Sequence, residues 1–263
     1  MNSKEPGGWR EALTGFPEFP RAGPVFRHSL EFVKASDIAE QYYCEMKLDL
    51  SYLLGRVPSD AKEEGERIHK KVFVMEEVEP KQLVPAIEKL KHVSATFTVY
   101  GTVGLLAIVG RPDAITFERG RPRWAIELKT TERNPAKLWT NQLVQVQTYG
   151  LLLDQMGFDV SKLDLVLARV QRVWAGRSDL ADALLKKTLV LLRSDKYREY
   201  EADHPGTVKF YVIPYDRSEA ERNILWAQDY WLGKREPVPA HSYGKCRACE
   251  YHERCDYSLY PRK

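Results

Sequence analysis

The sequence predicts a mixed α/β fold, with a central sheet flanked by helices, in a single domain spanning residues 1–263. Helical, hairpin and further helical patterns follow one another in the order typical of an α/β sandwich. The stretch from Gly110 to Thr131 contains two strand-like runs around a polar turn at 118–123 that includes a glycine and a proline. The hydrophobic content of 43% and the charged content of 29% are those of an ordinary globular protein.

The net charge of +3 and the pI near 8.5 are compatible with a nucleic-acid partner but do not require one. A phosphate-binding surface must therefore be local. The N-terminus lacks the apolar segment of a secretory signal. The longest apolar stretch, around 103–109, is far shorter than the ~20 residues of a membrane-spanning helix. We therefore expect a cytoplasmic protein with no membrane partner.

The secondary-structure pattern becomes clear after the first 30 residues, because four prolines and four glycines make residues 1–30 an expected irregular arm. Ser36 or Asp37 can cap the first helix. Helical periodicity predicts helices, and runs of β-branched and aromatic residues predict strands. The expected helices span 36–55, 61–74, 135–156, 179–199 and 218–231, and the expected strands span 95–100, 103–109, 112–118, 124–130, 163–172 and 208–215.

The second run of the hairpin carries charged residues with catalytic potential. Because side chains of a strand alternate between faces, Glu127 and Lys129 project to one side. Ile126 and Leu128 project to the other side, and Asp113 stands at the start of the preceding run. Two carboxylates beside one lysine can hold a divalent cation and leave a positive charge to act on a phosphate. A solvent-exposed edge strand is the alternative explanation.

Further polar residues lie on two of the predicted helices. His69 stands four residues after Gly65, and Gln145 stands four residues before Tyr149, so each pair shares one helix face. Taken alone, these residues also fit a surface or core histidine and the polar edge of an amphipathic helix.

The four cysteines are grouped in a way that favours metal ligation. Cys246, Cys249 and Cys255 form a C-x2-C-x5-C cluster, and Cys44 lies far upstream. In a reducing cytosol such grouping favours a metal or cluster over disulfides. The spacing alone fits a tetrahedral zinc, with His252 as a substitute ligand, as well as it fits a [4Fe–4S] cluster.

Four short motifs, taken in chain order, resemble those of the PD-(D/E)xK nuclease superfamily and in particular its RecB-like branch. The motifs are Gly65-x3-His69, Gly110-x-Pro112-Asp113, Glu127-x-Lys129 and Gln145-x3-Tyr149. One cysteine before them and three after them resemble the iron–sulfur exonucleases, which include the CRISPR-associated RecB-like exonucleases and exonuclease V. The resemblance covers about residues 36–256. It implies a restriction-endonuclease-like core over about 61–215 and a cysteine-ligated cluster subdomain formed by about 36–56 together with 241–257.

The resemblance also assigns roles to individual residues. Lys129 would orient the attacking water or stabilise charge on the phosphate, and Gln145 and Tyr149 would position Lys129 or the scissile strand. The implied ligands of Mg²⁺ or Mn²⁺ are His69, Asp113, Glu127 and the backbone carbonyl of Leu128. The implied ligands of a [4Fe–4S] cluster are Cys44, Cys246, Cys249 and Cys255.

The function implied by the resemblance is metal-dependent exonuclease cleavage of single-stranded DNA ends, from 5′ to 3′. The implied setting is CRISPR spacer acquisition, with CRISPR integration proteins as partners. The alternatives are repair-type end processing like that of exonuclease V, and a non-catalytic DNA-binding or adaptor protein on a nuclease scaffold. Relatives often follow the first cysteine with a proline and a basic residue, whereas this chain has Glu45 and Met46.

Overall fold

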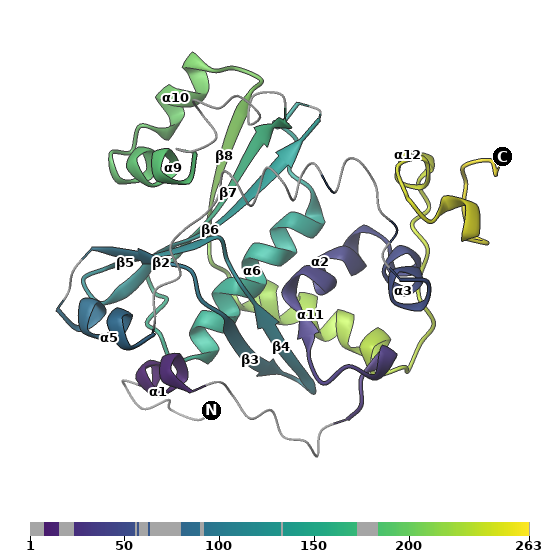
Figure 1. Cartoon of the computed structure of the whole chain (residues 1–263), viewed down its shortest axis with the longest axis horizontal. Coiled ribbons are helices and arrows are strands. Elements are labelled where there is room, and N and C mark those ends of the chain that lie inside the picture. Colours follow the sequence, from purple (N-terminus) through teal and green to yellow (C-terminus); the bar gives the residue numbers. More distant parts are fainter. Residues whose placement is uncertain are drawn as a thin grey trace.

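The mixed α/β architecture is confirmed, since helices cover both faces of a mixed β-sheet (Figure 1). The computed structural model describes residues 8–15, 24–55, 57, 63, 80–89, 92–132, 134–172 and 184–262. Apart from Glu63, the helix expected at 61–74 lies outside the described residues, and so does His69. No helix in the described part of the chain is long and apolar enough to cross a membrane.

The larger sheet has five strands in the order β2-β5-β6-β7-β8. They are β2 (Val93–Ala95), β5 (Ala114–Glu118), β6 (Arg121–Thr131), β7 (Asp164–Gln171) and β8 (Val208–Pro214). β6 and β7 run parallel and the other neighbours antiparallel, so the sheet is mixed. A parallel pair needs a crossover connection, which α6 (Thr140–Gln155) provides.

The structure adds a second, smaller sheet to the single central sheet that the sequence suggested. It contains β1 (Val33–Lys34), β4 (Leu106–Gly110) and β3 (Val99–Val103) in the order β1-β4-β3. The chain leaves this sheet at Pro112, which has no N–H for a ladder. The carbonyl of Pro112 accepts a hydrogen bond from Thr96 Oγ1 at 2.9 Å, which fixes the break between β4 and β5.

The hairpin of β5 and β6 has a tighter turn than expected. Arg119 and Gly120 have φ of 50° and 80°, and positive φ at both central residues matches the right-handed twist of the strands. Pro122 belongs to β6 and pairs with Phe117, where the register shifts. A bulge tolerates a proline because a ladder hydrogen bond is already missing there.

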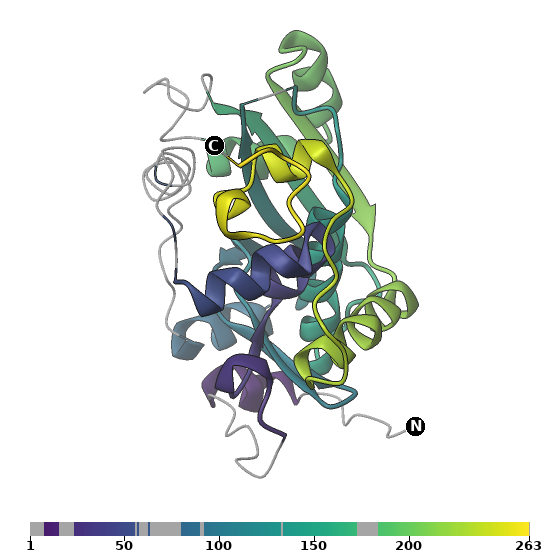
Figure 2. The same ribbon diagram turned by 90° about the vertical axis from the view of Figure 1, so that its right-hand side faces the viewer.

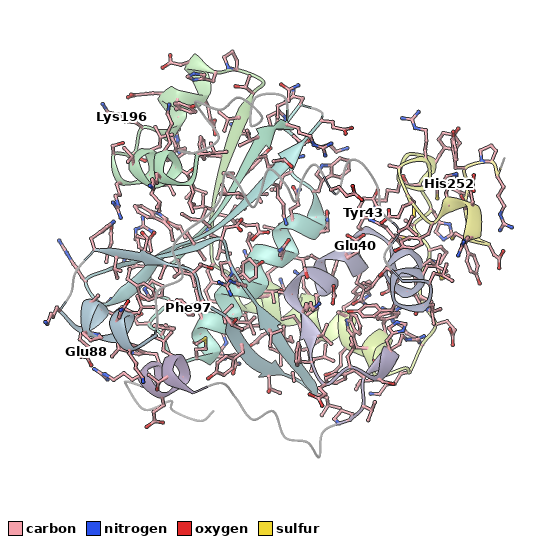
Figure 3. The ribbon with its side chains drawn as sticks, viewed as in Figure 1. Glu40, Tyr43, Glu88, Phe97, Lys196 and His252 are labelled. Carbon is pink, nitrogen blue, oxygen red and sulfur yellow. The ribbon has the colours of Figure 1, made fainter. Side chains whose placement is uncertain are left out.

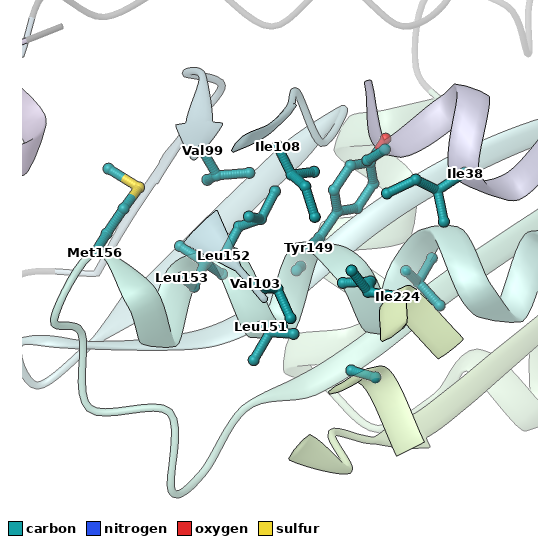
Figure 4. Close-up of a cluster of buried hydrophobic side chains, with 14 of the residues drawn as sticks. Ile38, Val99, Val103, Ile108, Tyr149, Leu151, Leu152, Leu153, Met156 and Ile224 are labelled. Carbon is teal, nitrogen blue, oxygen red and sulfur yellow. The ribbon is translucent and has the colours of Figure 1, made fainter. Parts of the chain in front are cut away.

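The two faces of the five-stranded sheet pack against different helices. Ile126 and Leu128 face a cluster that includes α9 (Leu184–Arg193) and α10 (Tyr197–Asp203). Ala125 faces the other cluster, which includes α6, α2 (Ala35–Tyr43) and α11 (Arg217–Trp231). Figure 4 shows part of this second cluster around α6. The alternation predicted for the second hairpin run is therefore confirmed.

Three predicted helices have different boundaries. The helix expected at 36–55 is two helices, α2 and α3 (Glu45–Leu53), separated by Cys44 in an extended conformation with φ −170° and ψ 115°. α6 begins at Thr140, after Trp139 in an extended conformation with φ −104° and ψ 138°, and the carbonyl of Pro135 accepts from Arg169 Nη1 at 3.1 Å. The helix expected at 179–199 is interrupted between α9 and α10 at Asp195, which has φ of 55°.

The N-terminal arm is not wholly irregular. It contains α1 (Trp9–Thr14), and the ring of Trp9 stacks on Phe158 with centroids 5.4 Å apart. Arg10 Nε pairs with Glu88 Oε1 at 2.6 Å, and Glu88 is the last residue of α5 (Pro80–Glu88). The sequence did not predict this helix. In contrast, α11 begins as expected, with the side chain of its N-cap residue, Asp216, accepting from the backbone N–H of Glu219 at 2.9 Å.

Gly110 generates a prediction because a Cβ there would lie 2.8 Å from the ring of Tyr149 and 3.2 Å from Ala35. Gly110→Ala should lower the free energy of unfolding by about 1–3 kcal/mol, the usual cost of overpacking. Denaturant unfolding followed by circular dichroism measures this. Gly244→Ala is the matched control, since a Cβ at Gly244 meets nothing within 4 Å. Equal stability of the two variants would contradict the close packing of α2, β4 and α6.

Candidate active site

Glu127 and Lys129 lie on β6 and project toward α6, on the face opposite Ile126 and Leu128. The residue Glu127 is 5% exposed, whereas the Lys129 side chain is 31% exposed. Lys129 Nζ lies 2.6 Å from Glu127 Oε1. The pair therefore places a buried carboxylate next to the ammonium group of a partly exposed lysine side chain.

Asp113 reaches the same point from the preceding strand. It stands directly before β5, and the antiparallel register pairs Ala114 with Ile126. Asp113 Oδ2 accepts a hydrogen bond from the backbone N–H of Leu128 at 2.7 Å. The hairpin thus brings the carboxylates of Asp113 and Glu127 to one end of the strand pair, with Leu128 between them.

Gln145 and Tyr149 of α6 contact Glu127 from the face of the sheet that α6 covers. Gln145 Nε2 donates to Glu127 Oε1 at 3.0 Å and to the Tyr149 hydroxyl at 2.7 Å. The Tyr149 hydroxyl donates to Glu127 Oε2 at 3.2 Å. Burial, together with the negative charge of Glu127, raises the pKa of Tyr149 well above its usual value. The hydroxyl therefore stays protonated and remains a donor to Glu127.

The charge of Lys129 depends on several carboxylates. Burial acts to lower the pKa of Lys129, but the ion pair and hydrogen bond with Glu127 and the charges of Asp113 and Glu40 outweigh it, so the pKa is raised. Lys129 is therefore an ammonium ion at neutral pH and not a base. No motif in the sequence connects Glu40, on α2, with Lys129; its charge acts on Lys129 because α2 packs against α6.

The oxygen atoms of Asp113 and Glu127 are hard donors of the kind that Mg²⁺ and Mn²⁺ bind. Among the residues that the structure describes, the four cysteines included, no group of three or more His, Cys, Asp and Glu side chains is arranged to hold a metal ion. The third predicted side-chain ligand, His69, lies outside those residues. The carboxylate pair fits a divalent cation, and its full ligand set stays a prediction.

The four cysteines, all free thiols, line one cavity between α3 and the C-terminal segment that contains α12 (Tyr243–Arg247). Figure 2 shows this segment lying across α3. Cys44 Sγ accepts from the backbone N–H of Ala240 at 3.3 Å. Burial raises the pKa of Cys249 to about 11. His252 lines the same cavity, and its Nδ1 lies 2.9 Å from the carbonyl oxygen of Cys249.

Two individual proteins are similar to this chain over very different extents. A stretch of 44 residues, 17% of this chain, is 34% identical to the mitochondrial exonuclease V of Candida tropicalis. That stretch corresponds to only 7% of the relative's length. The crystal structure of SSO0001 superposes with a TM-score of 0.46 and 14% sequence identity, over 96% of this chain and 93% of that one.

The family comparison covers far more of the chain. The model of the PD-(D/E)XK nuclease superfamily matches residues 33–256, which include both hairpin strands, α6 and all four cysteines. These residues also contain the carboxylate pair and the lysine described above. The chain belongs to the PD-(D/E)XK nuclease superfamily.

Proposed function

We propose that this protein is a metal-dependent DNA exonuclease that hydrolyses phosphodiester bonds at single-stranded ends, from 5′ to 3′. The observation that carries the proposal is the convergence of Asp113, Glu127 and Lys129 at one end of the β5–β6 hairpin. Membership of the nuclease superfamily supports this reading of the three residues.

Asp113, Glu127 and the backbone carbonyl of Leu128, with His69, would hold Mg²⁺ or Mn²⁺. A bound divalent cation lowers the pKa of a water ligand and neutralises charge on the phosphate. Lys129 adds a fixed positive charge, which stabilises charge that develops on the phosphate oxygens.

Gln145 and Tyr149 act through Glu127. Two hydrogen bonds, one to each carboxylate oxygen of Glu127, hold that side chain in one orientation, and a third between Gln145 and Tyr149 holds the two donors together. A carboxylate held in this way does not have to reorganise during the reaction, which is how preorganised sites lower a barrier.

We further propose that Cys44, Cys246, Cys249 and Cys255 hold a [4Fe–4S] cluster. All four line one cavity, which supports a shared site for Cys44 and the cysteines of the C-terminal segment. The role of the cluster would be structural, because ligand binding by distant segments contributes directly to folding free energy. Structural zinc, with His252 as a possible ligand, is the alternative.

Two biological settings follow from the proposed activity. One is CRISPR spacer acquisition with integration proteins, which rests on the resemblance to the CRISPR-associated RecB-like exonucleases. The other is repair-type end processing, which the short similarity to a protein named exonuclease V favours. A non-catalytic DNA-binding or adaptor protein is the remaining alternative, and the following experiments distinguish it from an enzyme.

Glu127→Gln and Lys129→Met should each lower kcat by about 100-fold or more, because the first weakens the proposed metal site and the second removes the positive charge placed beside the reacting phosphate. DNA binding measured by fluorescence anisotropy should change little. Glu132→Gln is the matched control, since Glu132 lies just past β6 with a side chain that is 66% exposed. A wild-type protein that degrades no DNA with Mg²⁺ or Mn²⁺ would favour the adaptor alternative.

A time course on single and double strands labelled at the 5′ or 3′ end tests polarity and strand preference. We expect short labelled products from 5′-labelled single strands at the earliest times, and long labelled products that shorten progressively from 3′-labelled ones. Degradation should need Mg²⁺ or Mn²⁺ and should stop on addition of a chelator. Equal rates on blunt duplexes would contradict the preference for single-stranded ends.

Cys44→Ser should remove visible absorbance and iron, and lower the free energy of unfolding by more than about 4 kcal/mol, as loss of a metal site does. Iron, sulfide and zinc analysis of the purified protein, with thermal unfolding, measures both effects. Ser258→Ala is the control, because Ser258 lines the same cavity without a thiol. Stoichiometric zinc without iron would establish the zinc alternative.

A further inference from the structure

The loop between β6 and α6, residues 134–139, is held beside Lys129. Arg169 of β7 is the register partner of Lys129 in the parallel β6–β7 pair, so the two side chains project to the same face of the sheet. Arg169 Nη1 donates to the carbonyl of Pro135 at 3.1 Å, and the Tyr211 hydroxyl donates to the same oxygen at 3.4 Å. Two donors from neighbouring strands therefore fix the start of this loop one strand away from Lys129.

This loop lies on the face of the sheet that α6 and α2 cover. Figure 3 marks the helices of the two faces, with Lys196 directly before α10 on one face and Tyr43 of α2 on the other. Arg169 projects away from α10, because the residues on either side of it along β7 belong to the cluster that includes α9 and α10. The loop that Arg169 holds therefore shares its face with Lys129.

The other end of the loop is connected to Glu127 through α6. The carbonyl of Trp139 accepts from the backbone N–H of Gln142 at 3.0 Å, where the helix begins. Gln142 stands three residues before Gln145 and shares a helix face with it, and Gln145 Nε2 donates to Glu127 Oε1 at 3.0 Å. Trp139 therefore stands roughly two helical turns from the residue that holds the buried carboxylate.

Lys137 and Trp139 form a basic and aromatic pair on this loop. Lys137 is exposed, Trp139 is half-buried, and Lys137 Nζ lies 4.1 Å from the centroid of the Trp139 ring. A cation over an exposed ring contributes about 2- to 5-fold to an equilibrium constant, whereas a nucleobase stacked on an aromatic ring contributes about 5- to 150-fold. A nucleobase can therefore displace the Lys137 amine from the ring.

An acceptor without a donor lies one turn along α6 from this pair. Gln142 Oε1 is buried and has no hydrogen-bond partner among the residues that the structure describes. A buried acceptor without a donor costs free energy, and such groups in folded proteins usually bind water or a ligand. An N–H donor on the edge of a bound nucleobase would satisfy this oxygen.

We propose that Trp139 stacks on an unpaired base of the DNA strand and that Lys137 contacts a phosphate next to that base. An aromatic platform beside a cation is the combination that proteins use to hold single-stranded nucleic acid. In a duplex the bases are already stacked on one another, so the ring accepts a base only from an unpaired end. The inference rests on the proposed nuclease function and supplies a physical basis for its preference for single-stranded ends.

Binding of labelled oligonucleotides in the presence of a chelator, followed by fluorescence anisotropy, tests the proposal without hydrolysis. The two probes are a short oligothymidylate and a strand of the same length whose sugars carry no bases. Trp139→Ala should raise the Kd for the oligothymidylate at least about fivefold and leave the Kd for the abasic strand unchanged. An equal change for both probes, no change for either, or a wild type that does not bind the oligothymidylate would overturn the proposal.

Lys137→Gln tests the phosphate contact separately from stacking. It should weaken the binding of both probes to the same extent, because both carry the same phosphates. The slope of log Kd against log salt concentration should fall by about 0.7, as expected for one lost phosphate contact on a single strand. An unchanged slope would contradict the phosphate contact.

Trp226 of α11 is the matched control for Trp139. It is 47% exposed, and the guanidinium carbon of Arg235 lies 5.0 Å from the centroid of its ring. Trp226→Ala should leave both Kd values unchanged. If Trp139→Ala does not fold, Trp139→Phe should retain the preference for the oligothymidylate over the abasic strand, and Trp139→Leu should lose it.

Failure of this inference and failure of the proposed function give different results. A wild type that binds the oligothymidylate through Trp139 but hydrolyses no DNA with Mg²⁺ or Mn²⁺ would refute the enzyme and retain the base platform. A wild type that hydrolyses DNA, while Trp139→Ala binds both probes as the wild type does, would retain the enzyme and refute the platform.

Discussion

The orientation of the Glu127 carboxylate is the constraint on which the site depends. A buried carboxylate is stable only when its oxygen atoms are hydrogen-bonded or paired with a cation. Here Lys129 comes from the same strand, whereas Gln145 and Tyr149 come from α6. The crossover helix between two parallel strands is therefore part of the site as well as part of the core.

That arrangement requires α6 to lie close to the strands and to α2. Gly110 allows the ring of Tyr149 to approach β4, and the same space admits Ala35 of α2. Close packing at this junction holds α2 against β4 and α6. The same junction places the Tyr149 hydroxyl on Glu127, so the packing of α2, β4 and α6 also supports the orientation of that carboxylate.

A polar network joins α3 to the C-terminal segment, in addition to the contacts around the cysteine cavity. Glu45, which is buried, accepts from both terminal nitrogens of Arg235, from Gln41 Nε2 at 2.7 Å and from the backbone N–H of Val238 at 2.8 Å. This residue stands where related proteins often have a proline after the first cysteine. Its ion pair attaches the C-terminal segment to α3 through contacts that need no metal.

The sequence by itself determined the strand alternation on β6, the hairpin that joins Asp113 to Glu127, and the pairing of Gln145 with Tyr149 on one helix face. These features follow from local periodicity, which the chain carries in every few residues. Tertiary structure decided where helices begin and end. Cys44 is extended between α2 and α3, and the carbonyl of Pro135 accepts a hydrogen bond from Arg169. It also decided that Asp113 accepts from the backbone N–H of Leu128 and that Gln145 and Tyr149 both donate to Glu127, because contacts between separate elements leave no trace in the spacing of residues.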